Sequence, residues 1–137
     1  MDEARLQVFA ASLARCTAEP LFLDRFYEIF LASSPRVREK FAHTDFVKQK
    51  ATLKASLGLM LLAARQEGQG PPEFLDGLAQ RHGASDLAVG ADLYDHWLDS
   101  LLAAVAVTDP AWSPEVGEAW EQALAVGISY LCHRFHR

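Results

Sequence analysis

The sequence predicts an all-α protein, and three observations support this fold class. Apolar residues recur three and four positions apart along most of the chain, which is the period of an amphipathic helix. No segment shows the alternation of apolar and polar residues that is typical of a half-buried β-strand. Proline, glycine and Ser-Pro pairs separate the periodic stretches, as they do at helix boundaries. We find no internal repeat and no linker, so residues 1–137 are expected to form a single domain.

The first two predicted helices run from about Glu3 to Cys16 and from about Pro20 to Ala32. In the first helix, the apolar stripe expected to face the core is Leu6, Phe9, Ala10 and Leu13. In the second helix, the corresponding face is Leu23, Phe26, Tyr27 and Phe30. The tyrosine hydroxyl needs a hydrogen-bond partner there, because a buried unpaired O–H group costs about 1–3 kcal/mol.

Two further helices follow in the first half of the chain. Ser34 before Pro35 is typical of an N-cap and a first-turn proline, and predicts a short helix that ends at Phe41. Thr44 or Asp45 is expected to cap a long helix over about residues 45–66. Its inward stripe is Phe46, Gln49, Leu53, Ser56 or Leu57, Met60 and Ala64. One amide side chain therefore lies on an otherwise apolar side.

The segment from Pro71 to Gly83 predicts a short helix with one imidazole near its end. Proline fits the first turn of a helix, and glycine suits the residue that follows a helix end. Leu78 and His82 are four residues apart and fall on the same side of this helix. Such a histidine is either a core residue with a hydrogen-bond partner or a ligand directed into a pocket.

The last two predicted helices run from about Ala91 to Val107 and from Pro114 to about Phe135, the second with Ser113 as its N-cap. The inner face of the first is expected to carry Leu93, Tyr94, Trp97, Leu101 and Val105. The inner face of the second is expected to carry Val116, Trp120, Ala123, Leu124, Gly127 and Leu131.

The composition excludes several classes of partner. A net charge of −5 and the lack of a basic stripe argue against binding to nucleic acid or to an anionic membrane surface. No apolar run is long enough to span a bilayer, and the acidic N-terminus does not resemble a signal peptide. Cys16 and Cys132 are too few for a disulfide scaffold, although a bridge between them is not excluded. These features predict a cytoplasmic protein.

Familiar catalytic motifs are missing from the sequence. It has no glycine-rich phosphate loop, no CxxC pair and no zinc-binding His-Glu-x-x-His helix. His133 and His136 are expected in a solvated tail, His43 in an exposed loop, and His96 at the surface or its boundary. The carboxylates are scattered over polar faces, so no paired acid and base is indicated.

Four inward-facing residues remain, each on a different predicted helix: Tyr27, Phe41, Gln49 and His82. Each has an ordinary explanation in core packing. Their spacing, with Pro35 six residues before Phe41 and Leu-Ala-x-x-His at residues 78–82, resembles the globin family. The resemblance covers nearly the whole chain and is closest to the non-truncated, single-domain bacterial hemoglobins.

The resemblance implies a three-over-three helical sandwich of about seven helices without a D helix. It implies heme b (iron protoporphyrin IX) as cofactor, with His82 as the proximal ligand of the iron. Phe41 would stack on the porphyrin, and Tyr27, Gln49 and Leu53 would line the distal side. The remaining heme contacts would come from Leu78, Val89, Leu93 and Trp97. Such a protein would reversibly bind O2, NO or CO, with high affinity for O2 because Tyr27 and Gln49 are hydrogen-bond donors.

Two other functions stay open. One is a nitric-oxide dioxygenase or nitrite reductase that uses a separate reductase. Tyr94 matches the tyrosine of such globins, but Phe135 stands where they carry a glutamate. The other is a heme-based gas sensor that acts through a partner, either as a monomer or as a homodimer, with Trp97, Trp112 and Trp120 as possible anchors. The partners of the heme propionates are open among Lys50, Lys54 and Arg81.

Overall fold

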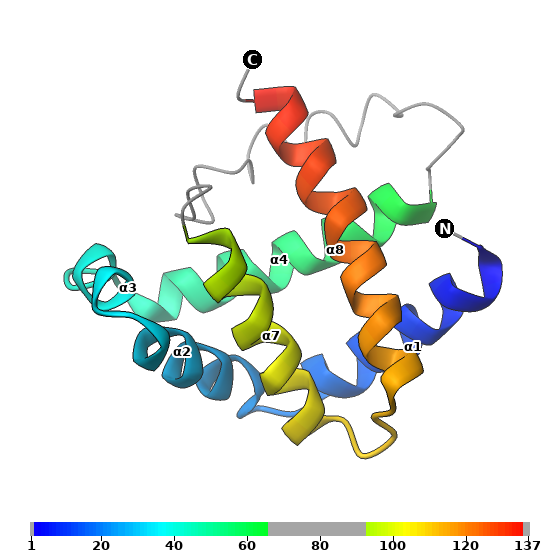
Figure 1. Cartoon of the computed structure of the whole chain (residues 1–137), viewed down its shortest axis with the longest axis horizontal. Helices are drawn as coiled ribbons and strands as arrows, with labels where there is room; N and C mark the ends of the chain where they lie inside the picture. The colour runs from blue at the N-terminus through cyan, green and yellow to red at the C-terminus, as the bar shows by residue number, and fades with distance from the viewer. Residues whose placement is uncertain (1, 66–92, 136–137) are drawn as a thin grey trace.

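Six α-helices make up most of the part of the chain that the computed structural model describes, which is residues 2–65 and 93–135, with side chains to residue 126. They are labelled in Figure 1. Their bounds are α1 Glu3–Ala18, α2 Phe22–Ser33, α3 Pro35–Lys40, α4 Phe46–Arg65, α7 Tyr94–Thr108 and α8 Pro114–Phe135. These residues contain no strand, and the all-α prediction is confirmed.

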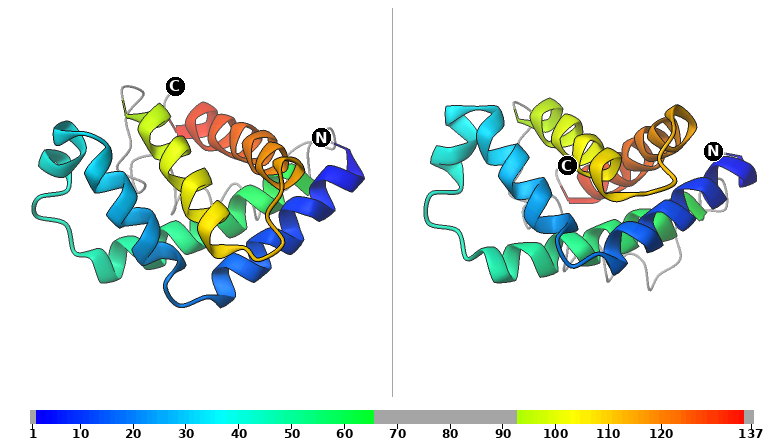
Figure 2. Two further views of the ribbon diagram at one scale, coloured as in Figure 1. Left: turned by 60° about the horizontal axis from the view of Figure 1, so that its bottom comes forward. Right: turned by 90° about the horizontal axis from the view of Figure 1, so that it is seen from below.

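The helices form two crossing layers. In Figure 1, α4 passes behind α7 and α8. The right-hand view of Figure 2 shows α1 and α4 along one side of the molecule and α7 and α8 along the other. Helix α2 packs against α7, while α8 packs against both α4 and α1. This arrangement is the globin-like fold that the sequence predicts.

Polar side chains begin the helices at the predicted places. Ser34 caps α3 by accepting a hydrogen bond from the main-chain N–H of Arg36 at 3.1 Å. Asp45, rather than Thr44, caps α4, because its Oδ1 accepts from the N–H groups of Val47 and Lys48 at 3.0 and 3.3 Å. Each cap satisfies donors that the first turn of a helix leaves unpaired.

Three helix ends differ from the prediction. Helix α1 continues to Ala18, and the Thr17 hydroxyl donates to a carbonyl one turn earlier at 2.8 Å. Helix α2 begins at Phe22 rather than Pro20, because the N–H of Phe22 closes a turn onto the Glu19 carbonyl at 3.1 Å. Helix α7 begins at Tyr94, three residues after the expected start. Hydrogen bonds near the turn between α1 and α2 account for the first two of these differences.

A single large cluster of apolar side chains joins all six helices. Trp120 of α8 lies at its centre, with the Phe9 ring edge-on at a centroid distance of 5.0 Å and Phe22 at 6.3 Å. Each fully buried side chain of this size stabilises the fold by about 1.5–3 kcal/mol. The largest fully buried side chains are Trp97, Trp120, Phe9, Phe22, Phe26, Phe30, Leu53, Leu57, Met60, Leu101 and Leu124.

A network of hydrogen-bonded polar side chains lies within this core. It includes a buried carboxylate, so the prediction that the carboxylates lie on polar faces is wrong at one position. Asp109, between α7 and α8, is only 4% exposed. It accepts from Ser12 at 2.6 Å and from two nitrogens of Arg15 at 2.6 and 2.9 Å. The Ser12 hydroxyl accepts in turn from the Trp120 indole N–H at 2.8 Å. Asp109 therefore fastens α1 to the segment that leads into α8.

The environment of this network shifts two pKa values in opposite directions. Hydrogen bonds from Arg15 lower the pKa of the Asp109 carboxyl to about 2. Burial raises the pKa of the nearby Cys16 thiol to about 11. Cys16 is a buried free thiol, and Cys132 lies among the residues whose side chains are not described.

Acid should weaken the fold by breaking this network. Because folding lowers the pKa of Asp109, its stabilising effect is present above about pH 4 and is lost as the pH falls through about 2. We expect Asp109→Asn to reduce the free energy of unfolding at neutral pH by about 1–3 kcal/mol and to flatten its decline below pH 4. Urea unfolding measured against pH checks this expectation. Asp99→Asn, which changes an exposed carboxylate of α7, should do neither.

Candidate functional site

Tyr27 is held in a cluster of aromatic rings on the inner face of α2. Its side chain is 5% exposed. The ring lies 4.8 Å from Phe26, 5.3 Å from Phe46 and 6.3 Å from Phe41 between centroids. Edge-to-face contacts at these distances leave the phenol little freedom to turn. The site therefore begins with a hydroxyl group fixed within an apolar wall.

Among the residues that the structure describes, the Tyr27 hydroxyl has one hydrogen bond, and that bond is long. It donates to the main-chain carbonyl of Gln49 at 3.5 Å, well beyond the usual distance for an O–H donor. Burial raises the pKa of the phenol to about 12, so it carries its proton at neutral pH. A better acceptor placed nearby would take this hydrogen bond.

Phe41 lies beside Tyr27 because α3 is short. It forms the C-cap of that helix, and its N–H donates to the Val37 carbonyl at 3.1 Å. The side chain is 3% exposed, with Phe30 at 5.6 Å and Phe46 stacked at 6.4 Å. The ring is thus directed back to the core, as predicted.

Helix α4 presents a mixed face toward the interior. Leu53 is 1% exposed, and Gln49, one turn earlier, is half-buried. Ser56 is fully buried one turn later, and its hydroxyl has no hydrogen-bond partner among the residues that the structure describes. An unpaired buried hydroxyl is uncommon in native proteins and needs an explanation.

Helix α7 contributes the opposite apolar wall. Leu93 and Trp97 are 3% and 2% exposed and belong to the same cluster as Tyr27, Phe41 and Leu53. The Trp97 indole stacks with Tyr94 at 6.1 Å and meets the Phe26 ring edge-on at 6.3 Å. Six residues predicted for the site are therefore described, and five of them are buried in one cluster. The other three, His82, Leu78 and Val89, lie outside the described residues.

Two further residues border this region. Phe46, predicted on the inward stripe of α4 but not as a site residue, belongs to the aromatic wall around Tyr27. Lys50, a candidate propionate partner, forms an ion pair with Asp24 of α2. No sequence pattern indicates that pair, since its members are 26 residues apart.

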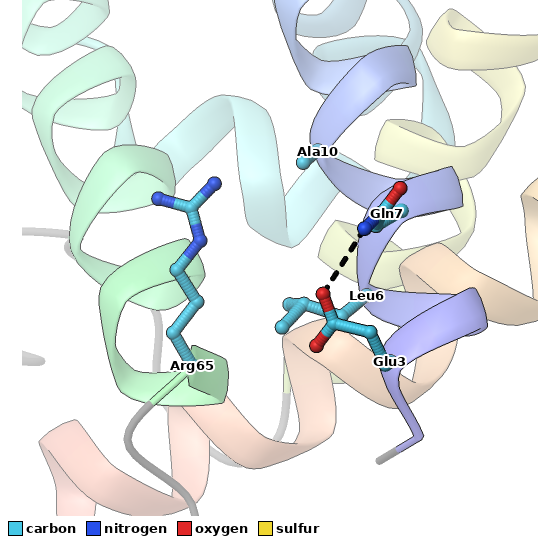
Figure 3. A pocket seen from close by; sticks show the side chains of 5 residues that line it. All are labelled: Glu3, Leu6, Gln7, Ala10 and Arg65. Carbon is cyan, nitrogen blue, oxygen red and sulfur yellow. Dashed lines mark hydrogen bonds between the residues drawn. The ribbon is translucent and has the colours of Figure 1, made fainter.

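A separate surface pocket of about 280 Å³ lies between α1 and the end of α4 (Figure 3). It is lined by Glu3, Leu6, Gln7, Ala10 and Arg65. The Gln7 amide donates to the Glu3 carboxylate at 3.1 Å, so its polar groups already pair with each other. Leu6 and Ala10 are only half-buried here, contrary to the prediction that they face the core.

The exposure of the remaining histidines and tryptophans shows which of them lie at the surface. His43 is exposed and His96 half-buried, as predicted. Trp97 and Trp120 are core residues, which leaves Trp112, 41% exposed, as a surface tryptophan. Within the described ranges, no helix is long and apolar enough to traverse a bilayer, and no three metal-binding side chains cluster.

Comparison with known proteins identifies the family. The sequence profile of the globins matches residues 24–131. The chain is similar to a Pseudomonas aeruginosa PAO1 protein whose crystal structure is described as structurally highly homologous to a human hemoglobin. The two share 37% identity over 96% of this chain and 98% of that one, with a TM-score of 0.78. A search of curated proteins finds no match. With most of its length matched by the family profile and this architecture, the chain belongs to the globin family.

Proposed function

We propose that this globin binds heme b through His82 and reversibly binds O2 with high affinity, with Tyr27 as the principal hydrogen-bond donor to the gas. The observation that carries the proposal is the Tyr27 hydroxyl. It is protonated, almost fully buried and held by apolar rings, yet within the described part of the chain its one hydrogen bond is 3.5 Å long. Structural tyrosines of a core are expected to make shorter bonds.

The described residues fit a planar apolar cofactor. Phe41, Leu53, Leu93 and Trp97 provide buried apolar surface on α3, α4 and α7. The unpaired Ser56 hydroxyl, on the same side of α4 as Leu53, is consistent with a face that receives a further molecule. His82 is the residue that we expect to hold the iron, with its other ring nitrogen donating to a backbone carbonyl.

In this proposal the heme iron binds the gas, and side chains on the distal side of the heme stabilise the bound gas. Ferrous heme, when bound, would supply the bond to the diatomic gas. Tyr27 would donate a hydrogen bond to the gas, and the Gln49 amide would offer a second donor. Such a bond in an apolar pocket contributes about 1–3 kcal/mol, or about 10- to 100-fold in affinity. Because bound CO is less polarised than bound O2, the donor favours O2. Leu53 limits the space beside the gas.

Replacement of the proximal ligand tests heme binding. We expect His82→Ala to lose the Soret band and the reduced-state spectrum of a histidine-ligated heme, because no imidazole would then hold the iron. Absorption spectra of the purified ferric and dithionite-reduced proteins measure this change. His43→Ala removes an exposed imidazole and should keep the wild-type spectrum. Identical spectra for the wild type and His82→Ala would contradict the assignment.

Removal of the distal hydroxyl tests the donor. Tyr27→Phe keeps the ring and its contacts but deletes the donor, so we expect O2 to dissociate about 10- to 100-fold faster. Stopped-flow measurement of O2 release gives this rate, and CO release, expected to change much less, serves as the internal control. An O2 rate within about twofold of wild type would show that Tyr27 is not the donor.

A further inference from the structure

Two polar contacts join α2 to α4 at adjacent positions, beside the packing of the Tyr27 ring on Phe46. One is the long hydrogen bond from the Tyr27 hydroxyl to the Gln49 carbonyl. The other is the ion pair between the Lys50 ammonium and the Asp24 carboxylate. Asp24 precedes Tyr27 by three residues and so lies one turn away on the same side of α2. Lys50 directly follows Gln49, so the ion pair lies beside the hydrogen bond from the Tyr27 hydroxyl to the Gln49 carbonyl.

The long hydrogen bond makes the spacing of these helices important. At 3.5 Å the Tyr27 contact is already at the limit of a hydrogen bond, so it does little to hold α2 and α4 together. The Lys50–Asp24 pair is a charge-assisted contact that draws α4 toward α2 at the same point. Of the two contacts, the ion pair is therefore the stronger constraint.

We propose that the Asp24–Lys50 ion pair is a positioning clamp that holds Gln49 and the Tyr27 hydroxyl in register and thereby slows release of the bound gas. Asp24 and Lys50 are positioning residues, since both act through Tyr27 and neither side chain belongs to the buried cluster. The proposal rests on the proposed gas-binding function for its effect on release, but the clamp itself is a property of α2 and α4.

The expected effect is modest. The side chains of Lys50 and Asp24 are 35% and 46% exposed, and an ion pair this open to water contributes little to stability. Loss of the clamp should therefore change rates by about two- to fivefold, well below the effect of deleting the Tyr27 hydroxyl. Asp24 also lies in the first turn of α2, where a carboxylate favours the helix dipole. For that reason both partners must be tested.

The variants are Lys50→Met, Asp24→Asn and the exchanged pair Asp24→Lys with Lys50→Asp. Their controls are Lys48→Met and Glu28→Gln, which remove the same charges from exposed positions elsewhere on the same helices. All these side chains are partly or fully exposed, so the variants should fold. Circular dichroism confirms this before the measurements.

The first measurement needs no heme. At pH 8, tetranitromethane nitrates the tyrosine rings that it can reach from solvent, so the nitration rate of Tyr27 in the apoprotein reports how often α2 and α4 separate at this point. Peptide mass spectrometry distinguishes Tyr27 from the other two tyrosines. We expect Tyr27 to be nitrated about two- to fivefold faster in Lys50→Met and Asp24→Asn, at the wild-type rate in the controls, and near that rate in the exchanged pair.

The second measurement uses the heme-loaded protein. We expect O2 release to accelerate about two- to fivefold in Lys50→Met, but not when the same change is made in Tyr27→Phe, because the clamp acts through that hydroxyl. An equal change in both backgrounds would overturn the proposal. So would equal nitration rates in Lys50→Met and Lys48→Met, or an exchanged pair as fast as the single variants.

The two arms separate this proposal from the function on which it rests. If the protein binds no heme, or if Tyr27→Phe releases O2 at the wild-type rate, the proposed function fails and the nitration rates alone decide the clamp. If heme and gas bind as proposed but neither rate responds to Lys50→Met, the clamp is wrong and the proposed function stands.

Discussion

The burial of α2 is the constraint on which the rest of the structure depends. Phe22, Phe26 and Phe30 recur every four residues along this helix, and each is fully shielded from water. A helix with so many large apolar groups is stable only when neighbouring helices cover it. Helix α7 covers most of the apolar surface of α2, and α3 and α4 cover part of the rest. Tyr27, beside Phe26, is carried into the interior with the rings around it.

Two buried polar groups, the Asp109 carboxylate and the Tyr27 hydroxyl, differ in the hydrogen bonds that they make. Asp109 receives bonds from Ser12, from Arg15 and from the main-chain N–H of Ala111 at 2.9 Å. Its charge is therefore fully compensated, as a buried carboxylate requires. Among the described residues, the Tyr27 hydroxyl donates one hydrogen bond, which is long. The carboxylate thus ties α1 to the turn before α8, whereas the hydroxyl is held mainly by the rings around it.

Local sequence signals gave most of the fold and part of the site. The caps at Ser34 and Asp45 follow from side chains that bond their own helix, so no distant residue is needed to predict them. Burial of Tyr27, Phe41 and Leu53 follows from helical periodicity. Their grouping around one pocket came from the resemblance to globins, because periodicity defines the inner face of each helix but not which inner faces meet.

The amino-acid sequence sufficed for the class of fold, the helices and most of their inner residues, since these depend on interactions within about four residues. The partners of Asp109 and Lys50, and the incomplete burial of Leu6 and Ala10, depend on how whole helices cross. Ser12 and Asp109 are 97 residues apart. Charged residues carry no periodic signature that reveals such a pairing, and it becomes visible only when packing has brought the helices together.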